Sequence, residues 1–451
     1  IYLLVIFNFI WSVTIYIPYD YPTIQDGINA SQNGDVVLVV PGTYMGKGNI
    51  NLDFEGKSIK LTSLYGPQVT VLDCANEERG VTFWSDEDST SILNGFTIIN
   101  GARLAGGGIY IEGSSPTIRN CMIINCSADD GGGIFCDFEA SPIIENCTLS
   151  NNSANNLGGG FYCHDDSSPT LKNLTITGNT AQKDGGGVFC GNNSNPNLQN
   201  VTITYNSAIE TGGGIYLRFQ SNAIMTNVLI SKNTVGGSGG GIRLLQSNPL
   251  MSNLTISKNI AENGGGMILA GSNPKIINSI IWDNGSGGIY FSTATGFESS
   301  VLITHSDIQD GEGGIITNDN GEVNWLEGNI ALDPLLNSNY TLKTDSPCIN
   351  SGSSFFVWQG DTLINMMAND YYGSAPDMGA TGFSCSSEIG DINNDGTWNV
   401  LDVVDLGNCV MTQNCLNLLY SCAGDLNGDG TYNVLDIVTL ANCVLAQNCG
   451  G

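Results

Sequence analysis

The chain has 451 residues, enough for a large core and for more than one domain. It carries 14 Lys and Arg residues against 43 Asp and Glu residues, and the net charge of −29 disfavours binding to nucleic acid and to anionic lipid. Its 14 cysteines indicate an oxidising compartment, so we expect a secreted, extracellular or cell-surface-attached protein.

Residues 1–14 (IYLLVIFNFIWSVT) form the first apolar segment. They are too few to span a bilayer, and they look like the hydrophobic region of a signal peptide that lacks its Met and its basic start. The sequence is then a fragment without its first residues. The alternative is that this segment is a buried first strand. No other segment approaches 18 continuous apolar residues, so we expect no membrane span.

Residues 18–45 are expected to open the folded part of the chain. An amphipathic pattern at 23–30, with Ile24 and Ile28 on one face, predicts a short helix. Such a helix would block the open end of a stack of strands, which otherwise recruits further strands. Residues 36–40 predict the first core strand.

A phrase built on three glycines recurs through the middle of the chain and indicates a stacked repeat. The strong copies, 25 to 27 residues apart, begin at Gly106, Gly131, Gly158, Gly185, Gly212, Gly239 and Gly264, and weaker ones begin at Gly287 and Gly313. Apolar residues alternate after each triplet, and Gly or Pro occurs in every period, which favours strands over helices. Three short strands per repeat predict one coil of a parallel β-helix. The expected fold is mainly β, with about 12 coils stacked about 4.8 Å apart.

Two sets of Asn residues recur with the same period. They are Asn120, Asn146, Asn173, Asn200, Asn227, Asn253 and Asn278, and Asn152, Asn179, Asn206, Asn233, Asn259 and Asn284. A polar side chain repeated at a turn predicts a ladder of amide hydrogen bonds along the stack. Several of these residues begin Asn-x-Ser/Thr triplets, for which glycan attachment is the alternative interpretation.

Five cysteines also follow the period. Cys136, Cys163 and Cys190 share one inward position that later coils fill with Leu, and Cys121 and Cys147 share another. We expect these five to be small buried hydrophobic residues.

An aromatic residue follows most of the triplets. Tyr110, Phe135, Tyr162, Phe189 and Tyr216 form one outward row. Exposed rings of this kind provide a flat surface for sugars. We therefore predict that the row is exposed to solvent.

One further position of the repeat carries charged and titratable side chains. Consecutive coils place Asp137, His164, Gly191 and Arg218 at this position, with Glu139, Asp165 and Asp166 beside it. Acids, a His and an Arg that converge on one face are groups that can carry out acid–base chemistry. These six charged or titratable residues are the candidate catalytic residues, and a solvated turn is the alternative.

After residue 314 the repeat fades. Residues 328–379 predict a closing segment over the second end of the stack, so the expected β-helix domain covers 18–383. Residues 384–389 are a Ser-rich linker to a different module at 390–451.

This module contains two near-identical copies, residues 390–415 and 424–449. Each opens with Asp-x-Asn-x-Asp-Gly-Thr-x-Asn-x-x-Asp and continues into an apolar helical pattern. Oxygen donors at positions 1, 3, 5, 7, 9 and 12, with Gly at 6, form a calcium-loop arrangement. The expected ligands of two calcium ions are Asp391, Asn393, Asp395, Thr397, Asn399 and Asp402, and Asp425, Asn427, Asp429, Thr431, Asn433 and Asp436. Acidic turns without metal are the alternative.

Six cysteines belong to this region. Cys409 and Cys415 recur as Cys443 and Cys449, so a disulfide across each helix end is our hypothesis. Cys385 and Cys422 form a candidate third pair.

The opening, the coils and the glycine phrase resemble right-handed β-helix proteins of the pectin-lyase-like superfamily. This resemblance implies a right-handed coil, and a lyase or hydrolase acting on acidic polysaccharides if the chain is an enzyme. The two C-terminal loop-helix units resemble a dockerin domain, which implies a cohesin-type partner. Loop positions 10 and 11, which contact that partner, are Val400, Leu401, Val434 and Leu435 here, in place of the Ser-Thr pair of many dockerins.

Two classes of function follow. The first is a polysaccharide-binding or polysaccharide-degrading component that its dockerin attaches to a cohesin-bearing scaffold or surface. The second is a non-catalytic adhesin or structural rod with the same attachment. In either case we expect a monomer.

Overall fold

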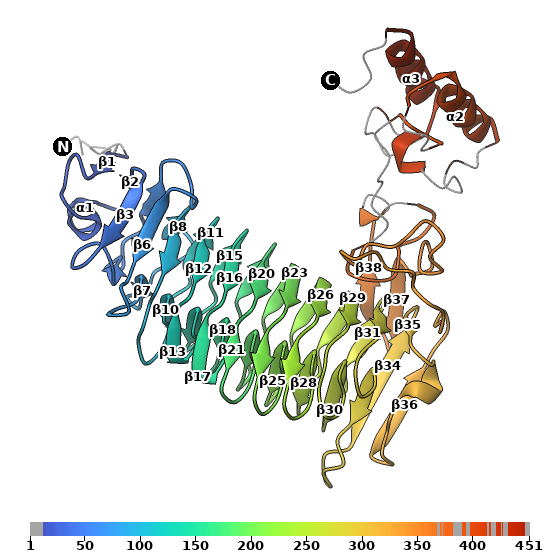
Figure 1. The fold of residues 1–451 in the computed structure, drawn as a ribbon, viewed down its shortest axis with the longest axis horizontal. Coiled ribbons are helices and arrows are strands. Elements are labelled where there is room, and N and C mark those ends of the chain that lie inside the picture. The colour runs from blue at the N-terminus through green and yellow to red at the C-terminus, as the bar shows by residue number, and fades with distance from the viewer. Residues whose placement is uncertain are drawn as a thin grey trace, which may run out of the picture.

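The computed structural model describes residues 12–367, 370–371, 373–381, 390–393, 397–412, 415, 421–424, 426 and 432–446. Most of the chain winds into a long parallel β-solenoid, and the C-terminal residues form helices (Figure 1). The expected parallel β-helix is therefore confirmed.

One face of the solenoid is a ten-stranded parallel sheet. Its strands are β4 (Leu52–Asp53), β7 (Val81–Phe83), β10 (Ile109–Glu112), β14 (Ile134–Asp137), β18 (Phe161–Cys163), β22 (Val188–Cys190), β25 (Ile215–Arg218), β28 (Ile242–Leu245), β30 (Met267–Ala270) and β33 (Ile289–Phe291). Each complete turn contributes one strand to this face, so the described residues form about ten complete turns. The sequence prediction of about 12 coils was too high, because the first and last coils lack a strand on this face.

The other strands of the coils form a 21-stranded sheet that bends around a corner. They are β1 (Thr14–Ile17), β2 (Val36–Val39), β3 (Gly42–Met45), β5 (Lys60–Ser63), β6 (Thr70–Asp73), β8 (Ile92–Asn94), β9 (Thr97–Ile99), β11 (Thr117–Arg119), β12 (Met122–Ile124), β15 (Ile143–Glu145), β16 (Thr148–Ser150), β19 (Thr170–Lys172), β20 (Thr175–Thr177), β23 (Asn197–Thr204), β26 (Ile224–Ser231), β29 (Leu250–Ser257), β31 (Lys275–Ile277), β32 (Ile280–Trp282), β34 (Ser299–Thr304), β35 (Asp307–Ile308) and β36 (Gly321–Trp325). In some coils two separate strands, such as β19 and β20, lie on either side of this corner. In others one long strand, such as β23, runs through the corner and pairs with both.

A short five-stranded sheet precedes the glycine triplets. Its strands are β13 (Ser127–Asp130), β17 (Ser153–Leu157), β21 (Thr180–Ala181), β24 (Ser207–Ala208) and β27 (Thr234–Val235). Each triplet therefore connects this sheet to the ten-stranded face.

The core is a continuous column of apolar side chains inside the coils. Register places Cys136 beside Cys163, Cys163 beside Cys190 and Cys190 beside Leu217 on successive coils. All four are buried. Cys121 and Cys147 are buried as well, and all five cysteines are free thiols, as the sequence predicted. They act as small hydrophobic residues in the core.

The buried Asn set forms the predicted ladder throughout, whereas the other set forms it only from Asn146 to Asn227, because Asn253 and Asn278 donate to carbonyl groups of the closing segment. In the buried set, Asn179 Nδ2 donates to Asn206 Oδ1 at 2.9 Å, and Asn206 Nδ2 donates to Asn233 Oδ1 at 3.0 Å. In the exposed set, Asn200 Nδ2 donates to Asn173 Oδ1 at 3.1 Å, and both residues have a φ of 55°. Asn tolerates this left-handed conformation better than other residues with a side chain, which explains its recurrence at the corner.

Separate elements lie at the two ends of the stack. Helix α1 (Ile24–Ala30) confirms the predicted N-terminal helix; its N-cap Thr23 accepts from the Asp26 amide, and Ile24 and Ile28 are buried. At the other end, η1 (Glu312–Gly314) lies between β35 and β36, and the hairpin of β37 (Phe355–Trp358) and β38 (Asp361–Asn365) follows the last coil. Leu342, Cys348 and Met378 pack against Ile280 on the late coils, where Asn278 Nδ2 donates to the Ser353 carbonyl at 2.8 Å.

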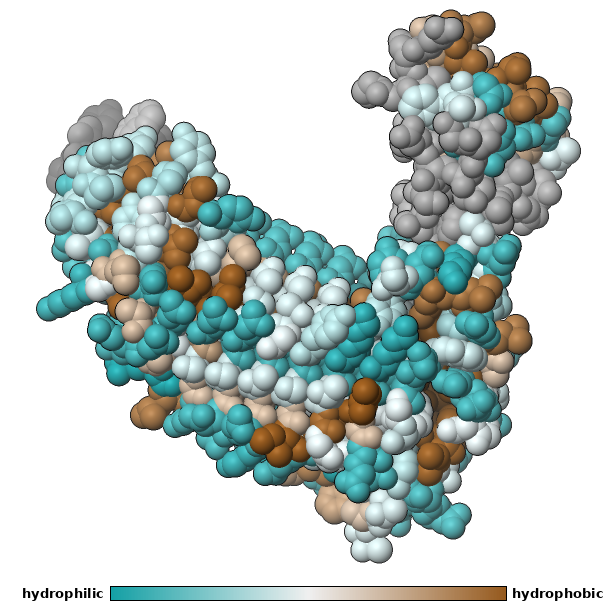
Figure 2. All heavy atoms as spheres, in the orientation of Figure 1, coloured by the Kyte–Doolittle hydropathy of each residue, from teal (hydrophilic) through white to brown (hydrophobic). Residues whose placement is uncertain are grey.

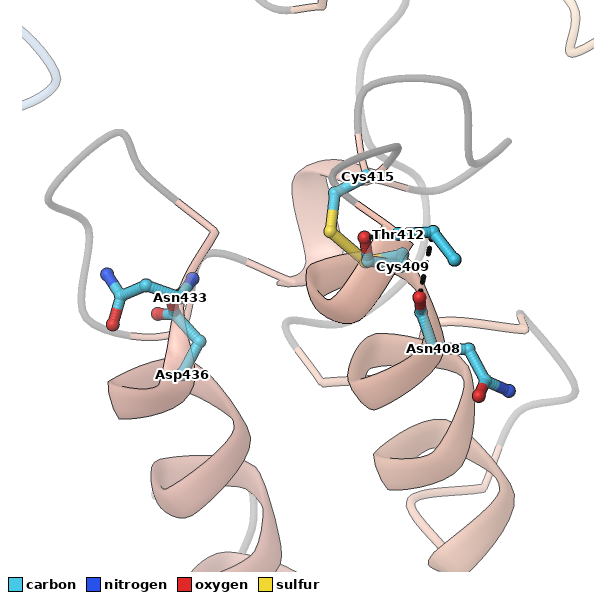
Figure 3. Close-up of a disulfide and its surroundings, with 6 residues drawn as sticks. All are labelled: Asn408, Cys409, Thr412, Cys415, Asn433 and Asp436. Carbon is cyan, nitrogen blue, oxygen red and sulfur yellow. Dashed lines mark hydrogen bonds between the residues drawn. A yellow bond between two sulfur atoms is a disulfide. The ribbon is translucent and has the colours of Figure 1, made fainter.

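The C-terminal part contains two helices, α2 (Val400–Thr412) and α3 (Val434–Ala446), and the 3₁₀ turn η4 (Ser421–Gly424). Leu406 and Leu440 are fully buried between them. Cys409 and Cys415 form the predicted disulfide, with an S–S distance of 2.05 Å (Figure 3). Cys443 is also disulfide-bonded, whereas Cys385 and Cys449 and the side chain of Cys422 lie outside the described part of the chain.

Within the described residues, the search for a helix that is long and apolar enough to cross a membrane finds none.

Candidate functional site

The outward side chains of the ten-stranded face form two columns along the stack. Register places Tyr110 beside Phe135, and Glu112 beside Asp137. The first set, here called the aromatic column, consists of Tyr110, Phe135, Tyr162, Phe189 and Tyr216. The second set, here called the polar column, continues the same registers and consists of Trp84, Glu112, Asp137, His164, Gly191 and Arg218.

The aromatic column is not the solvent-exposed row that the sequence predicted. Phe189 is fully buried, and Phe135, Tyr162 and Tyr216 are each less than a tenth exposed. The rings stack on one another, as between Tyr162 and Phe189, whose centroids are 5.3 Å apart. Only Tyr110, at the start of the column, is half-buried. That prediction was wrong. Because the rings are buried, this row cannot serve as a sugar platform.

The cover over the aromatic column is the segment that leads into each glycine triplet. Leu157 packs against the rings. The first glycine of the triplet is equally close, since a Cβ on Gly185 would lie 2.7 Å from the Cβ of Phe189. The chain therefore folds back over the rings. Strand alternation gives only the direction of a side chain, so the sequence could not reveal this second layer.

The polar column brings three of the candidate catalytic residues together. His164 Nδ1 lies 2.9 Å from Asp165 Oδ1 and 3.8 Å from Asp137 Oδ1. The His164 ring stacks on Tyr162 with centroids 5.6 Å apart, and Asn192 Nδ2 donates to Asp165 Oδ1 at 3.0 Å. Contacts on both sides thus fix the imidazole between two acids.

The surroundings shift the pKa values of this cluster. Asp137 is 8% exposed, and loss of hydration raises its pKa to about 6, with a further rise from the neighbouring Asp165 charge. Burial lowers the pKa of His164, although Asp165 acts in the opposite direction. His164 is therefore neutral at pH 7. The Asp165 carboxylate, 2.9 Å from Nδ1, favours the tautomer with its proton on Nδ1 and leaves Nε2 as the acceptor.

Gly191 leaves a notch in the polar column beside His164. A Cβ on Gly191 would lie 2.9 Å from His164 Cδ2, 3.4 Å from His164 Nε2 and 3.3 Å from Arg218 Nε. The acceptor nitrogen and the guanidinium thus border the same small space from opposite sides. Arg218 is held there by Phe189, whose ring centroid is 4.9 Å from the guanidinium carbon.

The other two candidates are not part of this cluster. Glu139 and Asp166 are exposed at the neighbouring corner, with φ values of 58° and 57°. For both, the solvated-turn interpretation fits their positions. Asn192 was not among the predicted residues, since its contact with Asp165 depends on a corner conformation that spacing does not specify.

The same cluster offers donors of the type that a metal ion binds. One ligand atom each from Asp137, His164 and Asp165 lies within 4.8 Å of the others. One imidazole nitrogen and two carboxylates suit a divalent cation. Such an ion would compete with the contact between His164 Nδ1 and Asp165 Oδ1.

The second predicted site lies in the C-terminal loops. Asp402 and Asp436, at position 12 of each loop, are fully buried and accept backbone hydrogen bonds from the start of their own loop. Asp391 is also buried. Asn393, Thr397, Asn399 and Asn433 are described, but Asp395, Asp425, Asn427, Asp429 and Thr431 lie outside the described residues.

These loops fit a hard cation. All of the predicted ligands are oxygen donors, as calcium requires. No Lys, Arg or His follows Lys343 in the sequence, so a basic side chain of this module cannot neutralise the buried carboxylates. A cation bound among these oxygen donors would offset the free-energy cost of burying the carboxylates.

The predicted partner-contact residues lie on an exposed apolar face. Val400, Leu401, Val434 and Leu435 are each more than half exposed. Val404, Met411, Val438 and Leu445 extend the face at equivalent positions of the two helices. Figure 2 shows these apolar residues gathered over α2 and α3.

Comparison with solved structures finds similar chains. A pectate lyase, Pel9A, is 18% identical, with 80% of this chain and 90% of that chain covered and a TM-score of 0.50. The A-module of the mannuronan C-5 epimerase AlgE6 from Azotobacter vinelandii is 16% identical, with 69% and 94% covered and a TM-score of 0.41. An alginate lyase from a Paenibacillus species is 11% identical, with 70% and 99% covered and a TM-score of 0.26.

At these identities the likeness concerns the fold. It confirms the expected resemblance of the coils to pectate-lyase-type β-helices. No curated protein matches the sequence. The family described as "Right handed beta helix region" matches residues 63–224 and 186–364, which together make up more than half of the chain. The chain therefore belongs to the right-handed β-helix family.

Proposed function

We propose that the solenoid degrades an acidic polysaccharide at the notch beside His164. The observation that carries this proposal is the placement of His164 Nε2 and Arg218 on two sides of the space left by Gly191. Asp165, behind the imidazole, orients it as a base. Perturbed pKa values in one small cluster support a site that transfers protons.

The three groups suit elimination from a uronate chain. Neutral His164 accepts the proton next to the sugar carboxylate, while the Arg218 guanidinium pairs with that carboxylate. Asp137, with its pKa raised to about 6, keeps a protonated fraction near neutral pH that can pass to the leaving oxygen. The electron pair of the broken C–H bond forms the new double bond, and the glycosidic oxygen leaves with the proton.

A substrate panel tests this proposal. The purified chain is incubated with uronate polysaccharides, with and without calcium, and the absorbance of unsaturated uronates and the number of reducing ends are followed. We expect cleavage that falls by about 10²- to 10⁴-fold in His164→Ala. Gly191→Ala fills the notch and should cause a similar loss without unfolding, because its Cβ meets only side chains there.

The chain contains one other histidine, which provides the control. His305 has a φ of 46°, a conformation that Asn also tolerates, so His305→Asn should retain full activity. Reducing ends without unsaturated products would show hydrolysis instead. Activity that survives in both His164→Ala and Gly191→Ala would contradict the proposed site.

A non-catalytic rod is the second candidate function. The burial of the aromatic column favours it, because the largest row of aromatic residues is used for packing and not for ligands. For this candidate we expect that no polymer of the panel is cleaved, so that neither unsaturated uronates nor new reducing ends appear.

We further propose that the C-terminal module is a calcium-binding dockerin that attaches the chain to a cohesin-type domain outside the cell. The buried carboxylates of Asp402 and Asp436 and the exposed apolar face of α2 and α3 support this proposal. The disulfide between Cys409 and Cys415 supports an oxidising location. Because the face is duplicated, either helix can take the same role in the complex.

A further inference from the structure

Three exposed aromatic residues lie along the polar column, on the open side of the ten-stranded face. Trp84 is 58% exposed, Phe138 is 55% exposed and Phe219 is 41% exposed. Trp84 is a member of the column, while Phe138 and Phe219 directly follow Asp137 and Arg218. They are not members of the buried aromatic column, and the sequence analysis did not single them out.

Folding does not explain the two phenylalanines. Phe138 has a φ of 55° and Phe219 a φ of 52°, a left-handed conformation that costs a residue with a bulky side chain about 1–2 kcal/mol. The same corner position carries Asp165 and Asn192 on the coils between them, and Asn and Asp tolerate this conformation far better. An exposed ring in a strained backbone gains little from burial, so its presence indicates a role at the surface.

The two rings lie on either side of the His164 cluster. Along the corner, the Glu139 amide donates to the Asp165 carbonyl, the Asp166 amide to the Asn192 carbonyl and the Asn193 amide to the Phe219 carbonyl. Phe138 is therefore one coil before Asp165, and Phe219 is two coils after it. Three coils separate the rings, which corresponds to about 14 Å at the ordinary strand spacing.

Trp84 extends the same line. It lies two coils before Phe138, and its Nε1 donates to Asp53 Oδ2 at 2.8 Å, which fixes the indole while more than half of it remains exposed. At the other end, the Arg218 guanidinium carbon lies 5.2 Å from the Phe219 ring centroid. Two of the three rings are thus held in place by polar neighbours.

We propose that Phe138 and Phe219 are sugar-stacking platforms on either side of the notch, with Trp84 as an outer platform. The polysaccharide then runs parallel to the axis of the solenoid. A coil rise of about 4.8 Å is close to the length of one pyranose residue, so about three sugar units connect the two phenylalanines. This inference rests on the proposed function and adds to it the direction and the minimum length of the substrate.

The test compares Phe138→Asn and Phe219→Asn with the wild type. Asn favours the left-handed conformation, so both variants should fold at least as well as the wild type. Loss of one stacking ring should weaken binding of a uronate polymer by about 3- to 10-fold and leave binding of a disaccharide unchanged. Tyr205→Asn is the matched control, because Tyr205 is 59% exposed with a φ of 57° at a different corner.

Affinity for the polymer and for the disaccharide is measured by calorimetry, and cleavage is measured in parallel. Equal affinity of both variants and the wild type for the polymer, with cleavage still abolished in His164→Ala, would overturn this inference alone. A wild-type chain that neither binds nor cleaves any polymer of the panel would overturn the proposed function as well.

Discussion

Gly186→Ala is expected to destroy the solenoid around the fourth glycine triplet, which begins at Gly185. A Cβ at this position would overlap the Ser207 carbonyl and lie 2.6 Å from the Gly213 carbonyl oxygen. Both atoms belong to the backbone of the next coil, which cannot move away without the loss of in-register hydrogen bonds. We expect destabilisation by more than about 4 kcal/mol, measured by chemical denaturation or as a loss of soluble protein.

Gly113→Asn is the control for this variant. Gly113 has a φ of 60°, but the nearest atom to its added Cβ is 4.0 Å away, and Asn tolerates the conformation. The free energy of unfolding should therefore change by less than about 1 kcal/mol. If Gly186→Ala unfolded at the same denaturant concentration as the wild type, the close stacking of the triplets would be wrong.

Loss of calcium binding in the double variant Asp402→Ala, Asp436→Ala is the second large effect that we expect. Each carboxylate is fully buried at position 12 of its loop, so each substitution should remove one of two calcium ions. Calorimetry should give two ions for the wild type, one for each single variant and none for the double variant. Binding to a cohesin-type domain should disappear in the double variant and in the wild type treated with a chelator.

Asp405→Ala, on the same helix α2, is the control for position 12 and should keep both ions. Duplication of the partner face gives a second comparison. Val400→Asp or Val434→Asp alone should leave cohesin binding within about tenfold, and the two together should abolish it. An unchanged calcium content in the Asp402→Ala, Asp436→Ala variant would contradict the assignment of the loops.

The period of the sequence was sufficient to predict most of the fold. In the strong triplets the second glycine lies where the chain passes closest to the next coil, and each Asn of the set from Asn120 to Asn278 lies where a corner has a positive φ. These backbone requirements select single residue types, so they are visible as a pattern. The number of complete turns was less predictable, because the end coils do not follow the period.

The candidate site could be predicted only in part. Asp137, His164 and Asp165 come together because register places residues one period apart on neighbouring coils. The burial of the aromatic column could not be predicted, since it depends on a segment that folds back over the strands. The exposure of Phe138 depends on its corner conformation, which spacing does not encode.

Register between coils is the geometric claim that underlies both the site and the platforms, and engineered disulfides test it most directly. Register pairs Thr175 with Thr202, which face outward on β20 and β23. Cysteines at 175 and 202 should form a disulfide on mild oxidation, because in-register neighbours on adjacent strands lie about 5 Å apart. Cysteines at 175 and 204 should not, since diagonal neighbours are about 7–8 Å apart. Rapid oxidation of the 175–204 pair, or none of the 175–202 pair, would contradict the account.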